Sequence, residues 1–260
     1  MEYEPLKHKL ESYVSLFPLL RKGLYRFMDL LLLRQRYVKR EIQAHFPKDR
    51  KLSVYDAGAG FCQYSDFVLA NWPDSYAFAT DLMTASLSSY ACYTDSYYQG
   101  RFSYKSGDLA KYHPLKKYDL ALAIDILEHI EDDLAVLKNF LAALKPGGYL
   151  IISTPSDLDE AARFTAEHVR PGYNKQELED KLRLAGFDIE KSIYTYGFFG
   201  KLSWLLMMKY PLQLISRKKL FLLPFYYLFA YPVAELLMQA DLKCKNKRGT
   251  GLLVVARPKG

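Results

Sequence analysis

The stretch "VYDAGAGFCQYS" (residues 54–65) joins an apolar run to an aspartate and to two glycines placed two residues apart. This order is typical of a strand that ends in a tight turn at a nucleotide site. Gly58 and Gly60 have no Cβ, so the backbone of the turn can approach a ligand closely. A dinucleotide fingerprint would place a third glycine where Gln63 stands. The turn therefore indicates a nucleotide-type ligand and disfavours a dinucleotide.

The middle of the chain alternates short apolar runs with helical patterns, which is typical of βαβ units and a largely parallel sheet. We expect strands at residues 52–55, 76–80, 102–105, 118–124, 149–153 and 189–196, and a last strand at 249–258. A helix is expected over residues 134–144, behind the acidic "EDD" and stopped by "KPGG" (residues 145–148). A second helix over residues 175–185 is expected to stop at Gly186.

Composition and charge narrow the class of protein. Half of the 260 residues are hydrophobic, which is ample for a buried core. Cys62, Cys92 and Cys244 have unrelated spacings, and the N-terminus lacks the layout of a secretion signal, so we expect a reduced, cytoplasmic compartment with no disulfide framework and no structural zinc. Residues 201–260 contain 11 basic and 2 acidic side chains. Such a flank suits an anionic surface, although a solvated face explains the charges equally well.

The chain divides into three expected regions. Residues 1–50 are expected to form amphipathic helices, residues 51–198 with 249–260 a nucleotide-binding domain, and residues 199–248 an apolar, basic-edged helical insertion. The insertion is longer than a loop needs, which favours a function for it. Residues 220–238 are long enough to span a bilayer, but a single span would leave the last strand across the membrane from its sheet. We therefore expect a lid that is buried or lies in the membrane interface, as a peripheral contact on the cytoplasmic membrane face.

Two further carboxylates follow strands at the spacing of a nucleotide site. Asp81 ends the second strand, about twenty residues past the glycines, where a carboxylate can accept both ribose hydroxyls. This position suits NAD and S-adenosylmethionine alike. Asp108 follows the third strand, where it can accept the exocyclic amine of an adenine, with Leu109 as an apolar edge. An ordinary helix cap is the alternative role of each carboxylate.

The series "VYDAGAG", "ATD", "GDL", "DILEH" and "LKPGGYLIISTP", in this order and spacing, resembles the class I S-adenosylmethionine-dependent methyltransferases. The resemblance is greatest to the small-molecule and lipid-quinone branch. It covers roughly residues 35–198 and the last strand, and "EHVRPGYNKQELEDKLRLAGF" (residues 167–187) strengthens it. The resemblance implies an α/β, Rossmann-like, doubly wound and mostly parallel seven-stranded sheet, with an antiparallel last strand. It also implies S-adenosyl-L-methionine as cofactor.

The same resemblance implies roles for individual residues. Asp56, Gly58 and Gly60 would hold the methionine end of the cofactor, Asp81 with Leu82 the ribose, and Asp108 with Leu109 the adenine, while Asp125 and Ile126 would line the cofactor after the fourth strand. The family usually has a glycine where Cys62 stands, so we expect a tighter or slightly displaced turn. Replacing Cys62 by glycine is expected to preserve or improve cofactor binding.

The chemistry of methyl transfer needs few protein groups. A sulfonium methyl is already activated, so the rate comes mainly from holding the acceptor in line and excluding water. A hydroxyl acceptor must also lose its proton, and His129 and His168 are the candidate catalytic bases, with a helix cap or a backbone hydrogen bond as their alternative roles. Asp125, Glu128 and His129 resemble a segment associated with a divalent metal in ubiquinone-pathway O-methyltransferases. Because metal-independent relatives also carry this segment, we expect no metal.

We expect methyl transfer to a small, hydrophobic acceptor, such as a lipid, quinone or phenol, most simply by O-methylation. An RNA acceptor is an alternative because the C-terminal flank is basic. However, "DILEH" differs from the Asn/Asp-Pro-Pro-aromatic segment that acts on nucleobase amines, so no nucleic acid partner is expected. A non-catalytic module that binds S-adenosylmethionine or docks on a membrane is another alternative, which Cys62 favours. Gln63 and Asp108 disfavour a nicotinamide oxidoreductase. The acceptor, the methylated atom and the oligomeric state stay open.

Overall fold

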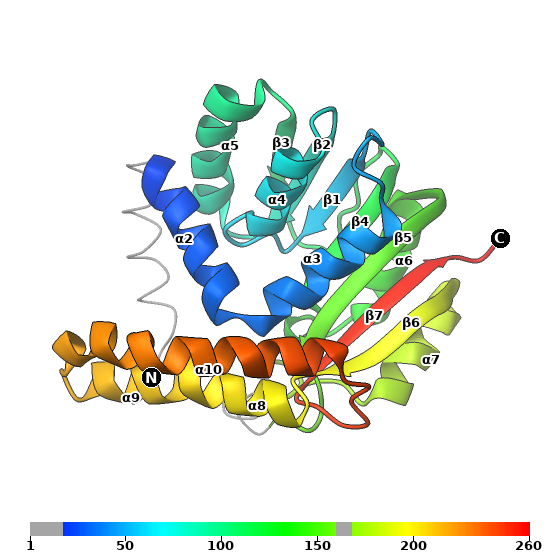
Figure 1. Cartoon of the computed structure of the whole chain (residues 1–260). Helices are drawn as coiled ribbons and strands as arrows, with labels where there is room; N and C mark the ends of the chain where they lie inside the picture. The colour runs from blue at the N-terminus through cyan, green and yellow to red at the C-terminus, as the bar shows by residue number, and fades with distance from the viewer. Residues whose placement is uncertain (1–17, 160–167) are drawn as a thin grey trace.

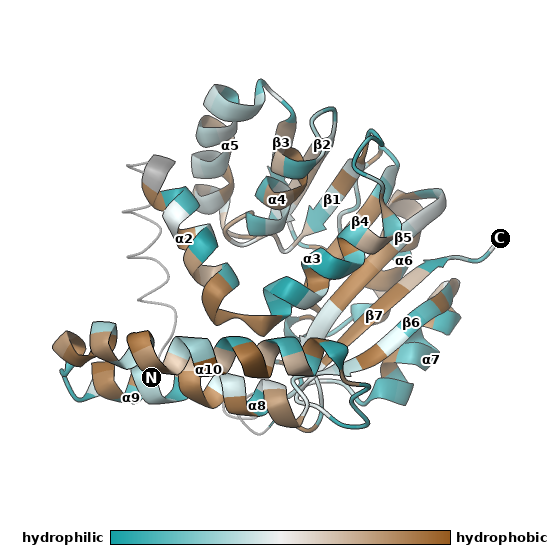
Figure 2. Ribbon diagram, in the orientation of Figure 1, coloured by the Kyte–Doolittle hydropathy of each residue, from teal (hydrophilic) through white to brown (hydrophobic). Residues whose placement is uncertain are grey.

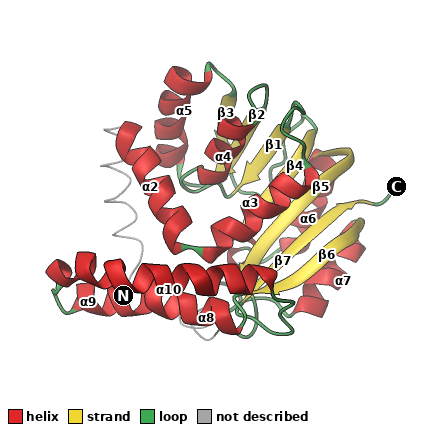
Figure 3. Ribbon diagram, in the orientation of Figure 1, coloured by secondary structure: helices red, strands yellow, loops and turns green. Residues whose placement is uncertain are grey.

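A single seven-stranded sheet forms the centre of the computed structural model, which describes residues 18–159 and 168–260. The strands are β1 (Ser53–Ala57), β2 (Tyr76–Asp81), β3 (Phe102–Ser106), β4 (Tyr118–Ile124), β5 (Leu144–Pro155), β6 (Phe187–Thr195) and β7 (Gly251–Pro258). Their order in the sheet is β3-β2-β1-β4-β5-β7-β6. The first five strands pair in parallel, and β7 runs antiparallel to both of its neighbours. This confirms the predicted doubly wound sheet with an antiparallel last strand (Figure 3).

Helices cover both faces of this sheet (Figure 1). They are α2 (Pro18–Leu31), α3 (Leu33–His45), α4 (Gln63–Asn71), α5 (Thr84–Tyr98), the 3₁₀ turn η1 (Leu127–His129), α6 (Asp133–Ala143), α7 (Lys175–Ala185), α8 (Phe198–Trp204), the π-helical η3 (Leu205–Lys209), α9 (Tyr210–Ser216), the 3₁₀ turn η4 (Leu220–Leu222) and α10 (Leu223–Lys243). Side chains of α6 and α7 share one core cluster with the sheet, while α3, α4, η3 and α10 share another cluster on the opposite face.

The sequence of β4 explains why the sheet is covered on both faces. All seven residues of "YDLALAI" are buried. Leu120 and Leu122 point into the α3 and α4 side of the core, and Ala121 and Ala123 point into the α6 and α7 side. A strand that is apolar on both faces is stable only between two helical layers, because neither face can be left in water.

Both predicted helix ends agree with the structure to within one residue, since α6 ends at Ala143 and α7 at Ala185, but the strand after α6 begins earlier than predicted. The helix α7 ends at Ala185, and Gly186 caps it with a φ of 102°, a left-handed conformation that favours glycine, as predicted. The stop "KPGG" (residues 145–148) was predicted to precede a strand, but it lies inside β5, which begins at Leu144. Leu144 pairs with Tyr118, and the ladder then shifts register before Leu120. Residues 145–148 therefore form an irregularity between the pairs at Leu144 and Tyr149, and Gly147 adopts a φ of 72° there.

The predicted N-terminal helices are present where the structure describes them. Tyr37 and Ile42 of α3 pack on the sheet beside α4. Residues 1–17 of the expected N-terminal region and Glu167 of the segment 167–187 lie outside the described residues.

The insertion between β6 and β7 forms a hairpin of helices. The chain leaves the sheet after Thr195, runs out through α8, η3 and α9, and returns along α10 to Gly251 (Figure 1). Thr195 and Gly251 are partners in the antiparallel ladder. Figure 2 shows apolar segments along the outer part of α9 and α10. In the part of the chain that the structure describes, Leu220–Lys243 is the one helical stretch long and apolar enough to cross a membrane.

Asp119 joins β1, β4 and β5 near their N-terminal ends, at the opposite end of these strands from the glycine turn. Its carboxylate accepts hydrogen bonds from the Ser53 N–H at 2.9 Å, from the Ser53 hydroxyl at 2.6 Å and from the Lys145 ammonium at 2.9 Å. Burial alone would raise the pKa of Asp119, but the bonds from Lys145 and Ser53 outweigh it and lower the pKa to about 2. Because the folded pKa lies below the ordinary value, the stabilisation is present above about pH 4 and is lost as the pH falls through 2.

We expect Asp119→Asn to lower the free energy of unfolding by about 1 to 2 kcal/mol at neutral pH, since it removes the charged acceptor of this network. Denaturant unfolding of both proteins between pH 7 and pH 2 measures the difference, which should shrink toward the acid end. Asp188→Asn, at an exposed position of β6, is the matched control. A difference that stays constant with pH would contradict the assignment.

Candidate functional site

The two glycines of the first turn have different structural roles. Gly58 has a φ of +70°, and a Cβ there would lie 2.5 Å from Cγ1 of Ile126. Gly58 is therefore required for the contact between the turn and the end of β4. Gly60 has a φ of +52°, and a Cβ built there would meet no atom within 4 Å. The open side of the turn, where a ligand can approach the backbone, is thus at Gly60.

Asp81 lies directly beside Gly60. One of its carboxylate oxygens accepts the Gly60 N–H at 2.9 Å, and the other accepts the Met83 N–H at 2.8 Å. A carboxylate offers about four lone-pair positions, so each oxygen keeps a second position for a ligand hydroxyl. Leu82, the next residue, is exposed. The arrangement fits the ribose of S-adenosylmethionine at the position predicted for it.

Asp56 is buried beneath the turn and is directed at α4. Its carboxylate accepts the Ser65 hydroxyl at 2.7 Å and the Ser65 N–H at 3.2 Å. Burial raises the pKa of Asp56 to about 6, although the two bonds from Ser65 oppose the shift. The side chain thus anchors the turn to α4.

Cys62 adopts a conformation that explains why related turns have a glycine there. Its φ is 59°, in the left-handed region, and its side chain is buried among Tyr25, Leu69 and Leu87. A non-glycine residue in this conformation costs roughly 1 kcal/mol, and the buried thiol offsets this cost by filling the core. Burial also raises the pKa of the thiol well above its ordinary value. The backbone at residue 62 therefore adopts the left-handed conformation although the residue is not a glycine.

Of the two residues predicted to contact the adenine, Asp108 has an accessible side chain and Leu109 a buried one. Asp108 accepts the Ala110 N–H at 2.9 Å and lies 3.4 Å from the Lys111 ammonium, yet its side chain remains partly exposed. Leu109 is buried in the cluster of α6 and α7. Asp108 can thus reach a ligand amine, while the Leu109 side chain packs in the core.

Asp125 stands at the end of β4 with a φ of 49°. Its N–H donates to the Ser153 carbonyl at 2.8 Å, which holds the ends of β4 and β5 together. Its carboxylate forms an ion pair with Arg34 from α3. Ile126, the next residue, contacts Gly58. The structure therefore brings Ile126 against the glycine turn and directs the Asp125 carboxylate at α3.

A cavity of about 560 Å³ opens beside Asp125. It is lined by the ends of α3, β5, β6 and β7 and by the base of the hairpin: Leu32, Arg34, Asp125, Ser153, Thr154, Pro155, Leu158, Asp159, Thr195, Tyr196, Lys201, Trp204, Leu205, Lys209, Thr250 and Gly251. The hairpin wall is the π-helical segment Leu205–Lys209 with the preceding turn of α8. π-helical segments are frequent at functional sites, because they redirect side chains that a regular helix would place elsewhere.

Arg34 is one of three cations in the cavity lining and the one that contacts Asp125. Burial would lower the pKa of its guanidinium, but the neighbouring Tyr64 and Tyr196 hydroxyls raise it, so the side chain stays charged. The Tyr196 hydroxyl also accepts a hydrogen bond from the backbone N–H of Arg34 at 3.0 Å. Sequence reasoning missed Arg34, because one arginine among several in a basic amphipathic helix carries no local signal.

Glu128, His129 and His168 come together next to the cavity. The two imidazole rings lie 4.6 Å apart in an edge-to-face arrangement. One candidate ligand atom from each of the three side chains lies within 4.8 Å of the others. Glu128 is buried, which raises its pKa, and its carboxylate accepts the hydroxyl of Thr154, a cavity residue, at 3.0 Å. Two imidazoles and a carboxylate suit proton transfer and could also hold a divalent cation.

The donor set differs from the metal hypothesis made on the sequence. That hypothesis grouped Asp125 with Glu128 and His129, whereas the structure pairs Asp125 with Arg34 and brings His168 to Glu128 and His129. His168 belongs to another segment of the chain, so sequence spacing could not identify it as the third member.

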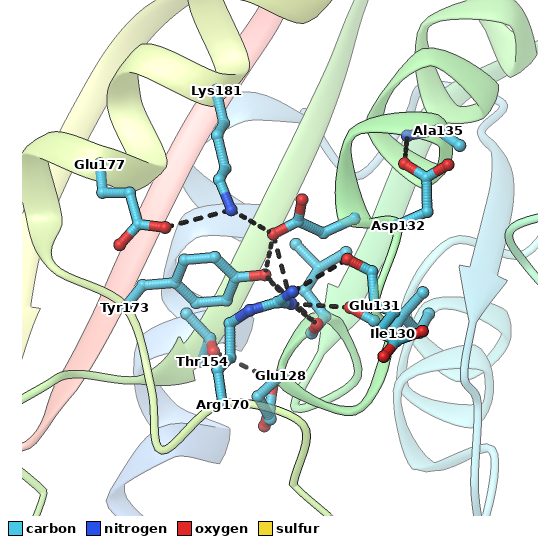
Figure 4. A network of polar contacts seen from close by, with 12 residues as sticks. Glu128, Ile130, Glu131, Asp132, Ala135, Thr154, Arg170, Tyr173, Glu177 and Lys181 are labelled. Atoms are coloured by element: carbon cyan, nitrogen blue, oxygen red, sulfur yellow. Dashed lines mark hydrogen bonds and ion pairs between the residues drawn. The ribbon is translucent and has the colours of Figure 1, made fainter.

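A polar network fixes the segment that carries His168 (Figure 4). Arg170 donates to the carbonyls of Leu127 at 2.9 Å and Ile130 at 2.7 Å, and to the Tyr173 hydroxyl at 2.8 Å. Tyr173 in turn donates to the Asp133 carboxylate at 2.6 Å. The backbone N–H of Val169 donates to the Glu128 carbonyl at 3.0 Å. These bonds hold the segment that carries His168 against the loop that carries Glu128 and His129.

Comparison with known proteins agrees with this geometry. Residues 31–192 match the family described as "Methyltransferase domain". Trans-aconitate 2-methyltransferase from Azoarcus sp. (strain BH72) is 26% identical over 121 residues, 46% of each chain. Ubiquinone biosynthesis O-methyltransferase from Bradyrhizobium sp. (strain ORS 278) is 35% identical over 51 residues, 20% of each chain. The chain thus matches less than half the length of these curated relatives.

A solved structure supports the same fold. Phosphoethanolamine N-methyltransferase 2 from Haemonchus contortus, in complex with S-adenosyl-L-methionine, superposes with a TM-score of 0.59 at 18% identity, covering 84% of this chain and 51% of that one. The family match extends over more than half of the sequence and includes the glycine turn, Asp81, Asp108 and the His168 segment. The chain therefore belongs to the class I S-adenosylmethionine-dependent methyltransferases.

Proposed function

We propose that the protein transfers the methyl group of S-adenosylmethionine to the hydroxyl oxygen of a small, hydrophobic acceptor of lipid, quinone or phenol type, bound in the cavity beneath the hairpin. The observation that carries this proposal is the cavity itself, because it joins the end of β4, beside the cofactor turn, to an apolar wall supplied by the insertion.

The cofactor would lie along the carboxyl ends of β1, β2 and β4. Gly60 would give its backbone room, Asp81 would accept the ribose hydroxyls and Asp108 the adenine amine. Asp56 would support the turn from below through Ser65. When bound, the cofactor supplies an activated methyl group, so the chain must orient the acceptor and exclude water.

The cavity lining favours an amphiphilic acceptor. Trp204, Leu205 and Leu158 offer apolar surface. Lys201 and Lys209 bring positive charge to the same space, while the charge of Arg34 is paired with Asp125. A cationic field stabilises an oxyanion, so it would promote loss of the proton from an acceptor hydroxyl. An acceptor with an apolar hydrocarbon part and one ionisable oxygen matches both the apolar surface and the positive charge of the lining.

His129 and His168 are proposed as the groups that remove this proton. Their rings adjoin each other and Glu128, and Thr154 connects Glu128 to the cavity wall. A buried carboxylate next to an imidazole stabilises the imidazolium that forms when the ring accepts a proton. The match to an O-methyltransferase of ubiquinone biosynthesis supports an oxygen acceptor.

A hydrophobic carboxylic acid is a second candidate acceptor. Lys201 and Lys209 of the lining favour it, since a carboxylate is already deprotonated and would pair with one of these lysines. Methyl transfer to a carboxylate needs no base. The two acceptors therefore differ in their dependence on the histidines.

We expect Gly60→Ala to weaken S-adenosylhomocysteine binding by about tenfold or more, measured by calorimetry. A Cβ at residue 60 would enter the open side of the turn, where the ligand is proposed to lie. Gly100→Ala is the matched control, because Gly100 also has a positive φ, +74°, and open space around it. Both variants should lose about 1 kcal/mol of stability. Equal affinities in the two variants would refute the assignment of Gly60.

We expect transfer of labelled methyl from S-adenosylmethionine into the organic phase of a lipid extract from the host organism. His168→Gln and His129→Gln should each lower kcat by about a hundredfold for a hydroxyl acceptor. Retained turnover in both variants would favour the carboxylate acceptor. Label confined to water-soluble products would refute a lipid-like acceptor, and loss of turnover with a chelator would indicate a metal at Glu128, His129 and His168.

A further inference from the structure

The outer half of the hairpin carries an apolar stripe that the described chain leaves uncovered. Phe221, Phe225 and Phe229 are 71%, 66% and 75% exposed. Leu228, Val233 and Leu236 are also exposed, and these positions recur every three or four residues along one side of η4 and α10. A continuous exposed apolar surface of this kind marks an interaction site in a soluble protein.

The opposite side of α10 closes the hairpin. The hydroxyls of Tyr226 and Tyr227 donate to the carbonyls of Leu206 at 2.8 Å and Met207 at 3.1 Å. Ala234 and Met238, further along the helix, are buried in the core. The hairpin is therefore a packed unit, and the phenylalanine stripe is its outward face rather than an unfinished core.

The charge next to the stripe identifies the partner as an anionic lipid surface. Arg217, Lys218 and Lys219 are exposed at the turn between α9 and α10. The sequence contains no aspartate or glutamate from residue 191 to residue 234. A twofold interface needs a patch that is complementary to its own copy, and a cluster of three cations without a neighbouring carboxylate in the sequence does not supply this. A surface of anionic head groups over acyl chains complements both the cations and the phenylalanines.

The anchoring of α10 limits how deep the hairpin can enter. Arg36 of α3 holds Glu235 with two hydrogen bonds of 2.7 and 2.6 Å. Asp241 accepts the Gly200 N–H at 2.9 Å and the Tyr37 hydroxyl at 2.8 Å. Residues 220–233 precede the first of these anchors and make up about 21 Å of helix, against the roughly 30 Å of a bilayer core. The helix therefore lies in the interface and does not span.

We propose that residues 217–233 dock on an anionic membrane surface, with the phenylalanines in the acyl boundary and the three cations at the head groups. Lys209, on the cavity wall, precedes Arg217 by about 12 Å of helix. Docking would thus place the cavity close to the membrane from which a lipid-like acceptor is drawn. The docking proposal stands apart from the proposed reaction, because its test requires no turnover.

The test is co-sedimentation of the full chain with phosphatidylglycerol–phosphatidylcholine vesicles and with pure phosphatidylcholine vesicles. The triple variant Phe221→Ser, Phe225→Ser, Phe229→Ser should bind the mixed vesicles about tenfold more weakly or worse. The control is Leu115→Ser with Leu184→Ser, two exposed leucines outside the hairpin, which should bind as the wild type. Replacing Arg217, Lys218 and Lys219 by glutamine should abolish the preference for anionic vesicles. S-adenosylhomocysteine affinity, unchanged in every variant, would establish that each is folded.

Three results would overturn the proposal. The first is a wild-type protein that binds neither kind of vesicle. The second is a phenylalanine variant that binds as tightly as the wild type. The third is a wild-type dimer, by light scattering, that becomes monomeric in the phenylalanine variant and shows no vesicle binding, since the stripe would then be covered by a second copy.

Discussion

The pairing of Thr195 with Gly251 is the constraint on which the arrangement of the site depends. Because β6 and β7 are antiparallel neighbours, the insertion between them must leave and return at one point of the sheet. That point lies next to Pro155, which pairs with Gly251 from the other side. The hairpin is therefore fixed beside the carboxyl end of β5, where it supplies the wall of the cavity.

The same constraint decides between two interpretations of the apolar sequence in the insertion. By length and composition alone, Leu220–Lys243 could be a membrane span. Its C-terminal part is instead committed to the domain through the bonds of Glu235 and Asp241. The polar residues that interrupt the apolar run are those that attach it to α3 and α8. The remaining apolar half is left to form the outward surface.

Much of the fold could be predicted from the sequence, because its determinants are local. The alternation of apolar runs placed every strand of the sheet, and Gly186 marked the end of α7. The beginning of β5 was predicted too late, because Leu144 already pairs with Tyr118 before the irregularity at residues 145–148. For the site, spacing along the chain predicted roles for Asp81 and Gly60, which the structure joins by a hydrogen bond of 2.9 Å. It could not identify Arg34, Trp204 or Thr154, whose proximity arises only when α3, the hairpin and β5 meet.

The proposed function requires that the cavity under the hairpin holds the acceptor beside the cofactor. Trp204 lines this cavity, and the only other tryptophan, Trp72, is buried with its N–H bonded to the Pro47 carbonyl at 2.9 Å. Fluorescence titration with a long-chain alkylphenol, comparing the wild type with Trp204→Phe, tests the claim directly. A saturable emission change that is lost in Trp204→Phe, with a Kd that alters when S-adenosylhomocysteine is present, is the expected result. Saturable binding that leaves the Trp204 emission unchanged would contradict the claim.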